Sequence, residues 1–205
     1  MSRAERTKCD LPEPFPGHDG GVWEPAPCKI VASWPVGHFA ENLAVSRTGE
    51  VFVSLHSHRR VDRYVPTTGS LAVYVEFPAP VSGLCFDETG VLWATGGTVG
   101  EPPGYVWRVS PGGRLESWAE IPDAVFLNGC TPHLDARAIL VCESVTGRIF
   151  KVDLATRTWR VWLSDSRLRP SNPQTPGANG IKLKAGYAYI SVSYTHLTLP
   201  TIYSV

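Results

Sequence analysis

The chain has 205 residues, 43% hydrophobic and 19% charged, a balance typical of a globular protein rather than a disordered chain. Lysine and arginine together number 19, as do aspartate and glutamate, so the formal net charge is zero. A nucleic-acid or anionic-membrane partner would reward a basic surface, which this composition does not provide. We therefore predict no nucleic-acid partner and no membrane partner.

Residues 1–24 are rich in proline, glycine and charge without a hydrophobic period, and we interpret them as a loose leader. Residues 1–8 are polar and lack the apolar core of a secretory signal, and no stretch reaches the roughly 18 apolar residues of a membrane span. The five cysteines, an odd number without a C-x-x-C pair, indicate neither a disulfide framework nor a zinc knuckle. These features predict a cytoplasmic location.

Residues 30–35, Ile-Val-Ala-Ser-Trp-Pro, are the first segment with strand composition. From residue 41 onward the chain repeats itself in four units, each of which opens with a short hairpin. The units start at Glu41, Ser82, Asn128 and Asn179, at spacings of 41, 46 and 51 residues. The hairpins are predicted at 41–45 with 51–54, 82–86 with 91–95, 128–132 with 139–142, and 179–183 with 187–190.

Two further strands follow each of the first three hairpins. The third strands alternate apolar and polar residues at 61–64, 106–109 and 149–152, and the fourth strands cover 72–78, 116–122 and 158–163. Four short antiparallel strands per unit at this period are typical of a propeller blade. We predict an all-β fold, a β-propeller of which residues 25–191 hold about three and a half blades. Residues 30–35 would then be the outer strand that completes the last blade.

Residues 192–201, Val-Ser-Tyr-Thr-His-Leu-Thr-Leu-Pro-Thr, resemble the translation of a transposase adapter used to prepare sequencing libraries. We therefore interpret residues 192–205 as a non-native tail, in which Tyr194 and His196 carry no chemistry. A real strand is the alternative interpretation, because these residues are β-prone. On the first interpretation the natural sequence departs near Ser191, and the chain is a fragment whose open ring leaves sheet faces uncovered.

The first position of each unit is the candidate site. The first strand of a propeller blade lines the central channel, so Glu41, Ser82, Asn128 and Asn179 are expected to converge near the axis. One carboxylate and two amide oxygens would suit a hard cation, which prefers oxygen ligands. Taken singly, each residue also has a structural interpretation, since Asn-Gly is a common turn pair and a glutamate at a rim is ordinarily solvated. The matching repeat positions favour the site, with Ser82 as a bystander.

Four segments of the repeat resemble the SMP-30/gluconolactonase/LRE-like family. They are 39–45 (Phe-Ala-Glu-Asn-Leu-Ala-Val), 127–129 (Leu-Asn-Gly), 143–149 (Glu-Ser-Val-Thr-Gly-Arg-Ile) and 177–181 (Gly-Ala-Asn-Gly-Ile), within a likeness from about residue 34 to residue 191. The resemblance implies a six-bladed propeller with one divalent cation, calcium or zinc, on its axis. It also implies a hydrolase of sugar lactones or related esters, with a small-molecule substrate.

By position, Glu41 and Asn179 resemble two metal ligands of that family, and Asn128 resembles a residue that contacts the substrate or a metal-bound water. The family takes a further ligand and general base from an Asp in a later blade. No residue of this chain fills that position, so the catalytic residue is unassigned and the fragment is expected to be inactive. A non-catalytic propeller that binds a ligand or a protein on one face stays open as an alternative, as does a strictosidine-synthase-like propeller.

Other side chains give weaker indications. His56 and His58 either reach the channel mouth or form a polar turn, and His133 is expected to face solvent. Cys85 and Cys142 are expected to be buried reduced thiols. Cys130 follows the Asn128 position closely enough to approach the channel, but a nucleophile needs a positioned base and the sequence offers none.

Overall fold

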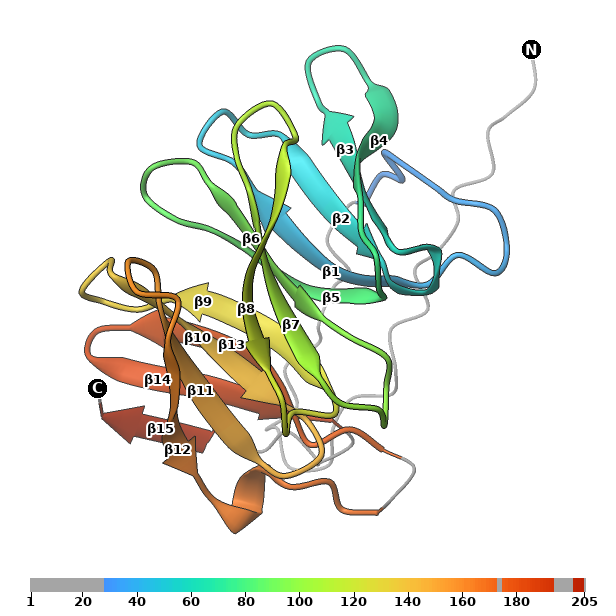
Figure 1. Ribbon diagram of the computed structural model, residues 1–205. Coiled ribbons are helices and arrows are strands. Elements are labelled where there is room, and N and C mark those ends of the chain that lie inside the picture. The colour runs from blue at the N-terminus through green and yellow to red at the C-terminus, as the bar shows by residue number, and fades with distance from the viewer. Residues whose placement is uncertain (1–27, 173–174, 194–200, 205) are drawn as a thin grey trace, which may run out of the picture. The chain divides into compact units, whose positions relative to one another are not determined.

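The computed structural model describes residues 28–172, 175–193 and 201–204. A compact unit runs Trp34–Val205, separate from Met1–Ser33. Its strands form four antiparallel sheets that succeed one another along the chain (Figure 1). No helix in the described residues is long and apolar enough to cross a membrane.

Three sheets have four strands each, paired in sequence order. Blade 1 contains β1 (Ala40–Val45), β2 (Val51–Leu55), β3 (Arg60–Val65) and β4 (Ser70–Glu76). Blade 2 contains β5 (Val81–Phe86), β6 (Leu92–Gly96), β7 (Gly104–Val109) and β8 (Leu115–Ile121). Blade 3 contains β9 (Leu127–Pro132), β10 (Ala138–Glu143), β11 (Arg148–Asp153) and β12 (Trp159–Ser164). Blade 4 contains β13 (Ala178–Lys184), β14 (Tyr187–Val192) and β15 (Thr201–Ser204). Two short 3-10 turns, η1 (His56–His58) and η2 (Ser166–Leu168), follow β2 and β12.

This architecture confirms the predicted all-β fold and partial β-propeller. The boundaries of the predicted hairpin strands and outer strands lie within two residues of those observed. Residues 28–39 contain no strand in this chain, and the role predicted for residues 30–35, as the outer strand of the last blade, stays a prediction. A strand requires a ladder partner, and no sheet among the described residues pairs with this segment.

The predicted boundary after residue 191 lies inside a sheet. β14 continues to Val192, and β15 pairs with β14 through Ile190 opposite Thr201. The pairing concerns the structure of this segment and not its origin, so the foreign tail stays a prediction. Tyr194 and His196 lie outside the described residues.

Apolar layers between successive blades form the core. One layer joins blades 1 and 2 and includes Phe52, Leu84 and Trp107. A second joins blades 2 and 3 and includes Trp93, Leu127 and Phe150, and a third joins blades 3 and 4 and includes Leu140, Ile181 and Ile190. Both faces of an inner blade are therefore buried, which explains why every residue of strands such as β6 and β10 is buried and most of them are apolar.

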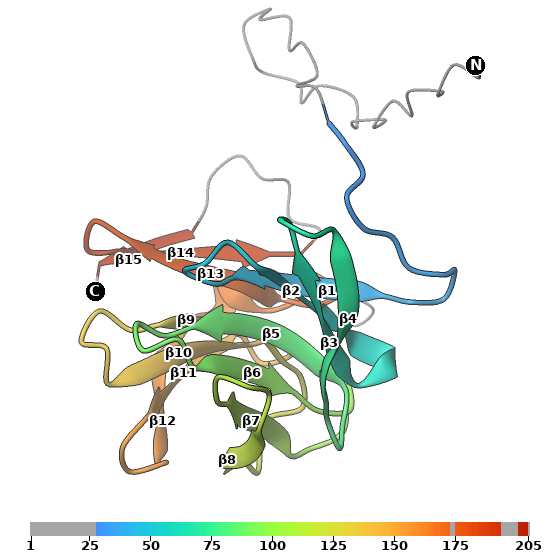
Figure 2. The same cartoon turned by 90° about the horizontal axis from the view of Figure 1, so that it is seen from above.

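The first strands of the blades lie beside one another, as expected for a propeller. β1 contacts β5, β5 contacts β9, and β9 contacts β13 (Figures 1 and 2). The outer strands β4, β8 and β12 lie on the far side of their sheets from these first strands. Residues at matching positions of β1, β5, β9 and β13 are therefore brought into neighbouring places.

One face of blade 1 lacks a covering blade among the described residues. Leu43 is 57% exposed, whereas the residues at the equivalent position of blades 2, 3 and 4, namely Leu84, Cys130 and Ile181, are at most 2% exposed. Asp62 on the same face stands where blades 2 and 3 place Trp107 and Phe150. It is 3% exposed, accepts a hydrogen bond of 2.8 Å from Trp34 Nε1 and pairs with Arg60 at 2.9 Å. The charge is thus buried with partners, as the cost of desolvation requires.

The hairpin turn of blade 2 is organised by Asp87. Its carboxylate accepts hydrogen bonds from the Thr89 backbone at 2.8 Å, from the Thr89 hydroxyl at 2.6 Å and from Trp93 Nε1 at 2.8 Å. Burial alone would raise the pKa of this carboxyl, but the hydrogen bonds from Thr89 and Trp93 outweigh burial and lower the pKa below its usual value of 3.8.

Candidate functional site

The four predicted site positions share a backbone feature. The register of each opening hairpin shifts between Ala40 and Asn42, between Val81 and Leu84, between Leu127 and Cys130, and between Ala178 and Ile181. Glu41, Ser82, Asn128 and Asn179 each lie within one of these bulges. A bulge re-aims a side chain and is common next to active sites. The repeat positions inferred from the sequence are therefore structurally equivalent.

Asn128 is the most constrained of the four residues. It is fully buried, and its Nδ2 lies 3.3 Å from the Ser144 hydroxyl, to which it donates. Its backbone carbonyl accepts a hydrogen bond of 2.6 Å from Thr95 of blade 2. The side-chain oxygen Oδ1 is buried without a hydrogen-bond partner among the described residues. Leaving a buried acceptor unpaired costs about 1–3 kcal/mol, so this atom is expected to have an external partner.

Asn179 repeats this arrangement one blade later. Its Nδ2 donates to the Ser193 hydroxyl at 2.8 Å, and the side chain is half-buried. Ser144 and Ser193 hold equivalent places, since their backbone N–H groups donate to Phe126 and Gly177, the residues just before β9 and β13. In both blades the amide nitrogen is thus held by a serine, which leaves the amide oxygen as the available ligand atom.

In blade 1 the place of these serines is taken by His56. Its backbone N–H donates to Phe39, and its ring Nδ1 lies 3.1 Å from the Ser82 hydroxyl of blade 2. The ring also makes an edge contact with Phe126, the residue before β9, at 6.4 Å between ring centroids. His56 lies in the turn η1, as the polar-turn interpretation predicts, and its ring also contacts Ser82 of the first strand of blade 2. His58 instead is exposed and stacks on His38.

Glu41 is half-buried in the bulge of β1, and no hydrogen bond or ion pair joins it to another described residue. Ser82 is fully buried, and its hydroxyl lies 3.1 Å from Nδ1 of His56. Neighbouring blades bring Ser82 beside Asn128 and Asn128 beside Asn179, whereas Glu41 and Asn179 lie at the two ends of this row. The roles of Glu41 and Asn179 as ligands, and of Asn128 in substrate binding, stay predictions.

Hydrogen bonds between blades hold this row together. The Ser54 hydroxyl donates to the Ser82 carbonyl at 2.7 Å, and the Ser144 hydroxyl donates to the Ala178 carbonyl at 2.6 Å. The glycine after the site residue permits the close approach. A Cβ on Gly83 would clash with the Asn128 carbonyl and lie 2.9 Å from the Cα of Gly129. A Cβ on Gly129 would likewise clash with the carbonyl oxygen of Asn179, so the Asn128-Gly129 pair serves blade packing rather than a simple turn.

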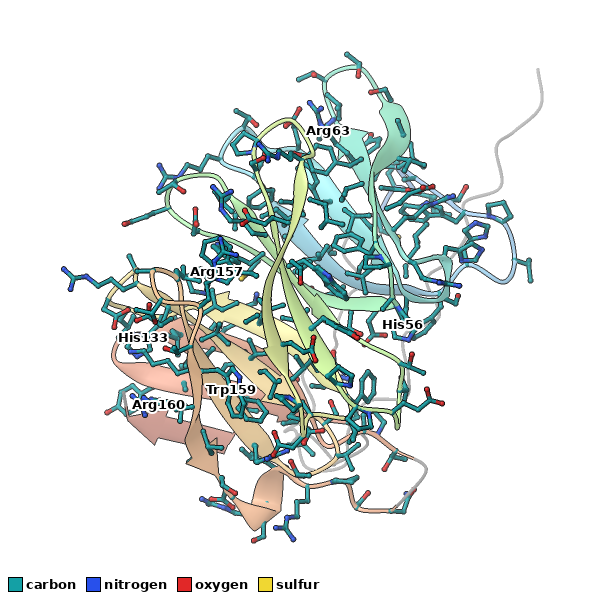
Figure 3. The ribbon with its side chains drawn as sticks, viewed as in Figure 1. His56, Arg63, His133, Arg157, Trp159 and Arg160 are labelled. Carbon is teal, nitrogen blue, oxygen red and sulfur yellow. The ribbon has the colours of Figure 1, made fainter. Side chains whose placement is uncertain are left out.

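Two other candidates have structural roles. Glu143 is fully buried and accepts hydrogen bonds from the backbones of Phe126 and Thr146, at 3.3 and 2.7 Å, so it holds the entry to β9. The expectation that His133 faces solvent is wrong, because its side chain is 16% exposed and packs against Asp135 and Lys151. It lies far from His56 (Figure 3).

The donor set indicates which cation would fit. Among the residues described, no three His, Cys, Asp or Glu side chains gather to hold a metal ion. The axial row, formed by Glu41, Ser82, Asn128 and Asn179, offers one carboxylate and two neutral amide oxygens. Such oxygen ligands suit calcium better than zinc. The unpaired Oδ1 of Asn128 is compatible with such a ligand. The supporting contacts of Ser144 and Ser193 were not predicted, although their position after the second strand of the blade matches that of His56 and was a usable signal.

Sequence comparisons do not assign the chain to a family: no family profile matches it, and no curated protein matches it. Solved structures do resemble it. A catalytically inactive virginiamycin B lyase from Staphylococcus aureus with quinupristin matches at a TM-score of 0.59 and 16% identity, covering 83% of this chain and 57% of the lyase. A chain of a nidogen/laminin complex matches at 0.59 and 14%, covering 75% and 55%.

A candidate gluconolactonase is also similar, with a TM-score of 0.57 and 18% identity over 76% of this chain and 58% of that protein. Identities this low show the fold alone. The chain spans less than three-fifths of the length of each of these three structures. The comparisons therefore agree with a partial propeller, and they do not identify a reaction.

Proposed function

We propose that this chain is part of a metal-dependent hydrolase of sugar lactones or related esters, whose complete propeller has six blades. The observation that carries the proposal is the unpaired, fully buried Oδ1 of Asn128, on a strand adjacent to that of Asn179. Similarity to a candidate gluconolactonase supports the same reaction class.

Glu41 and Asn179 would hold the cation through oxygen atoms, and the Oδ1 of Asn128 would contact the substrate or a water bound to the cation. Bound there, a divalent cation supplies Lewis-acid polarisation of a carbonyl and lowers the pKa of water. Ser144 occupies the amide nitrogen of Asn128, so the Oδ1 of Asn128 is turned away from that hydroxyl. As a neutral ligand, Asn179 would leave the cation more positive than a second carboxylate would.

His56 is the nitrogen base that the structure adds to this row. In the tautomer whose Nδ1–H donates to the Ser82 hydroxyl, at 3.1 Å, Nε2 is the ring nitrogen that could accept a proton from a reacting water. The family resemblance places a general base in a later blade. We include His56 as a second group that would assist proton transfer, because it lies beside Ser82 at the start of the inner strand β5.

Calcium titration of the 205-residue chain tests the ligand set. Glu41→Gln is expected to weaken binding about tenfold or more, since it removes the one carboxylate of the row. Glu76→Gln is the matched control, because Glu76 is an exposed carboxylate at the end of outer strand β4. If neither the chain nor the complete gene product binds calcium, the metal-dependent proposal fails.

A partner-binding propeller is the second candidate, favoured by the likeness to a chain of the nidogen/laminin complex. The two candidates differ in the complete protein. Lactone opening that stops on chelation supports the hydrolase. Calcium binding without turnover of sugar lactones supports a binding propeller in which the ion is structural.

A further inference from the structure

Two buried cysteines from adjacent blades face each other beside the axial row. Cys85 lies on β5 and Cys130 on β9, and their Sγ atoms are 3.4 Å apart, with the Cys130 thiol donating to Cys85. Cys85 is 5% exposed and Cys130 is 2% exposed. The contact spans 45 positions of sequence, so only the packing of blade 2 on blade 3 creates it.

We propose that Cys85 and Cys130 form an inter-blade disulfide when the folded protein meets a two-electron thiol oxidant. The site is a cross-linking site between blades 2 and 3, and its argument does not depend on the hydrolase proposal. The sequence predicts that Cys85 is a buried reduced thiol, whereas this proposal makes it a partner in a disulfide under oxidising conditions.

The backbone around the pair suits a short covalent link. Disulfides need Cα atoms about 4.4–6.8 Å apart, closer than most residues facing each other across packed sheets. β5 and β9 approach unusually closely here, since an added Cβ on Gly83 would lie only 2.9 Å from the Cα of Gly129. Cys130 directly follows Gly129, and Cys85 is two residues beyond Gly83. The sulfur atoms must move by a little more than 1 Å to reach bonding distance of about 2.05 Å.

The chemistry balances with an azodicarboxamide such as diamide as oxidant. One thiol adds across the N=N bond, its sulfur bonding to one nitrogen and its proton passing to the other. The second sulfur then attacks the first, and the departing nitrogen takes the second proton. Two thiols become one disulfide as the azo compound is reduced to the hydrazine. The second step needs no diffusion, because the two sulfur atoms are already in contact.

The environment sets the rate of this reaction. The hydrogen bond from Cys130, together with burial, raises the pKa of Cys85 well above its usual value, so little thiolate is present near neutral pH. Oxidation is therefore expected to be slow in the closed structure and to depend on brief opening between the blades. Such a link would also fix the spacing of the Ser82 and Asn128 bulges, which lie two to three residues away along β5 and β9.

The test uses the 205-residue chain with Cys9→Ser and Cys28→Ser, which leaves Cys85, Cys130 and Cys142 as its three thiols. Folded protein is treated with diamide, denatured, alkylated and mapped by mass spectrometry. The expected product has lost two hydrogen atoms, contains one Cys85–Cys130 cross-link and retains Cys142 as an alkylated thiol. Its thermal midpoint is expected to be higher than that of the reduced form.

Variants and a denatured control separate geometry from general reactivity. Cys142→Ala should leave the cross-link intact, because Cys142 packs toward blade 4, whereas Cys85→Ala should abolish it. The same reagent applied in urea should give a mixture of pairings that includes Cys142. A mixture from the protein in native buffer, or full alkylation of all three cysteines after oxidation, overturns the proposal.

Discussion

Leu84 and Leu43 occupy the same place in neighbouring blades and differ in what covers them. Each lies two positions after the bulge residue of its first strand, opposite Ala94 in blade 2 and Val53 in blade 1. Leu84 is 1% exposed within the layer between blades 1 and 2, whereas Leu43 is 57% exposed. Replacing each with alanine makes a matched pair in which side chain, strand and register are held constant.

The expected costs follow from the buried area. Removing the equivalent of three methylene groups from a buried leucine forfeits about 2.4 kcal/mol of transfer free energy, at about 0.8 kcal/mol for each group. The cavity that remains adds to this, so Leu84→Ala should lower the free energy of unfolding by about 3–4 kcal/mol. Leu43 keeps less than half of its surface buried, so Leu43→Ala should cost about 1 kcal/mol or less.

Urea unfolding followed by tryptophan fluorescence measures both variants against the parent chain. The midpoint should fall sharply for Leu84→Ala and barely move for Leu43→Ala, with similar slopes. Equal losses at the two positions would refute the reasoning, because they would mean that the outer face of blade 1 is covered in solution. A concentration-dependent midpoint for Leu43→Ala would identify that cover as a second chain.

Three further predictions concern single side chains. Gly83→Ala should destabilise the chain by about 2–3 kcal/mol, because the added methyl group would clash with the Asn128 carbonyl. Gly180→Ala is the control, since its methyl group would meet only the hydroxyl of Ser191. In the same urea assay it should cost less than half as much free energy of unfolding. Glu143→Gln should lower the free energy of unfolding by about 1–3 kcal/mol, because it places an amide where backbone N–H groups need an acceptor, and calorimetric calcium titration should show unchanged affinity. The lowered pKa of Asp87 means that its carboxylate stabilises the fold above the unfolded value near 3.8 and that this contribution is lost as pH falls below it. Asp87→Asn should therefore be less stable than the parent chain near neutral pH, with the gap closing in acid; a gap that does not depend on pH would contradict the assignment.

The repeat carried the fold prediction because strand composition and turn residues are local properties. The alternation in β3, β7 and β11, and the Gly-containing turns between paired strands, specify where each strand begins and ends. Aligning the repeat units on their first residue was enough to predict which four residues are equivalent, namely Glu41, Ser82, Asn128 and Asn179. Strand composition does not suffice by itself, however: residues 30–35 are strand-prone but form no strand in this chain, where no described sheet pairs with them.

The sequence by itself determined that the chain folds into blades, where each blade starts, and which four residues line the first strands. Only the tertiary structure decided what those residues contact. Packing of one blade on the next placed His56 against Ser82, put Cys85 against Cys130, and left Oδ1 of Asn128 buried without a described partner. These contacts join residues from 26 to 45 positions apart, and no local pattern encodes them. They depend on how closely two neighbouring sheets approach. That distance is set jointly by the volumes of all the side chains packed between the sheets.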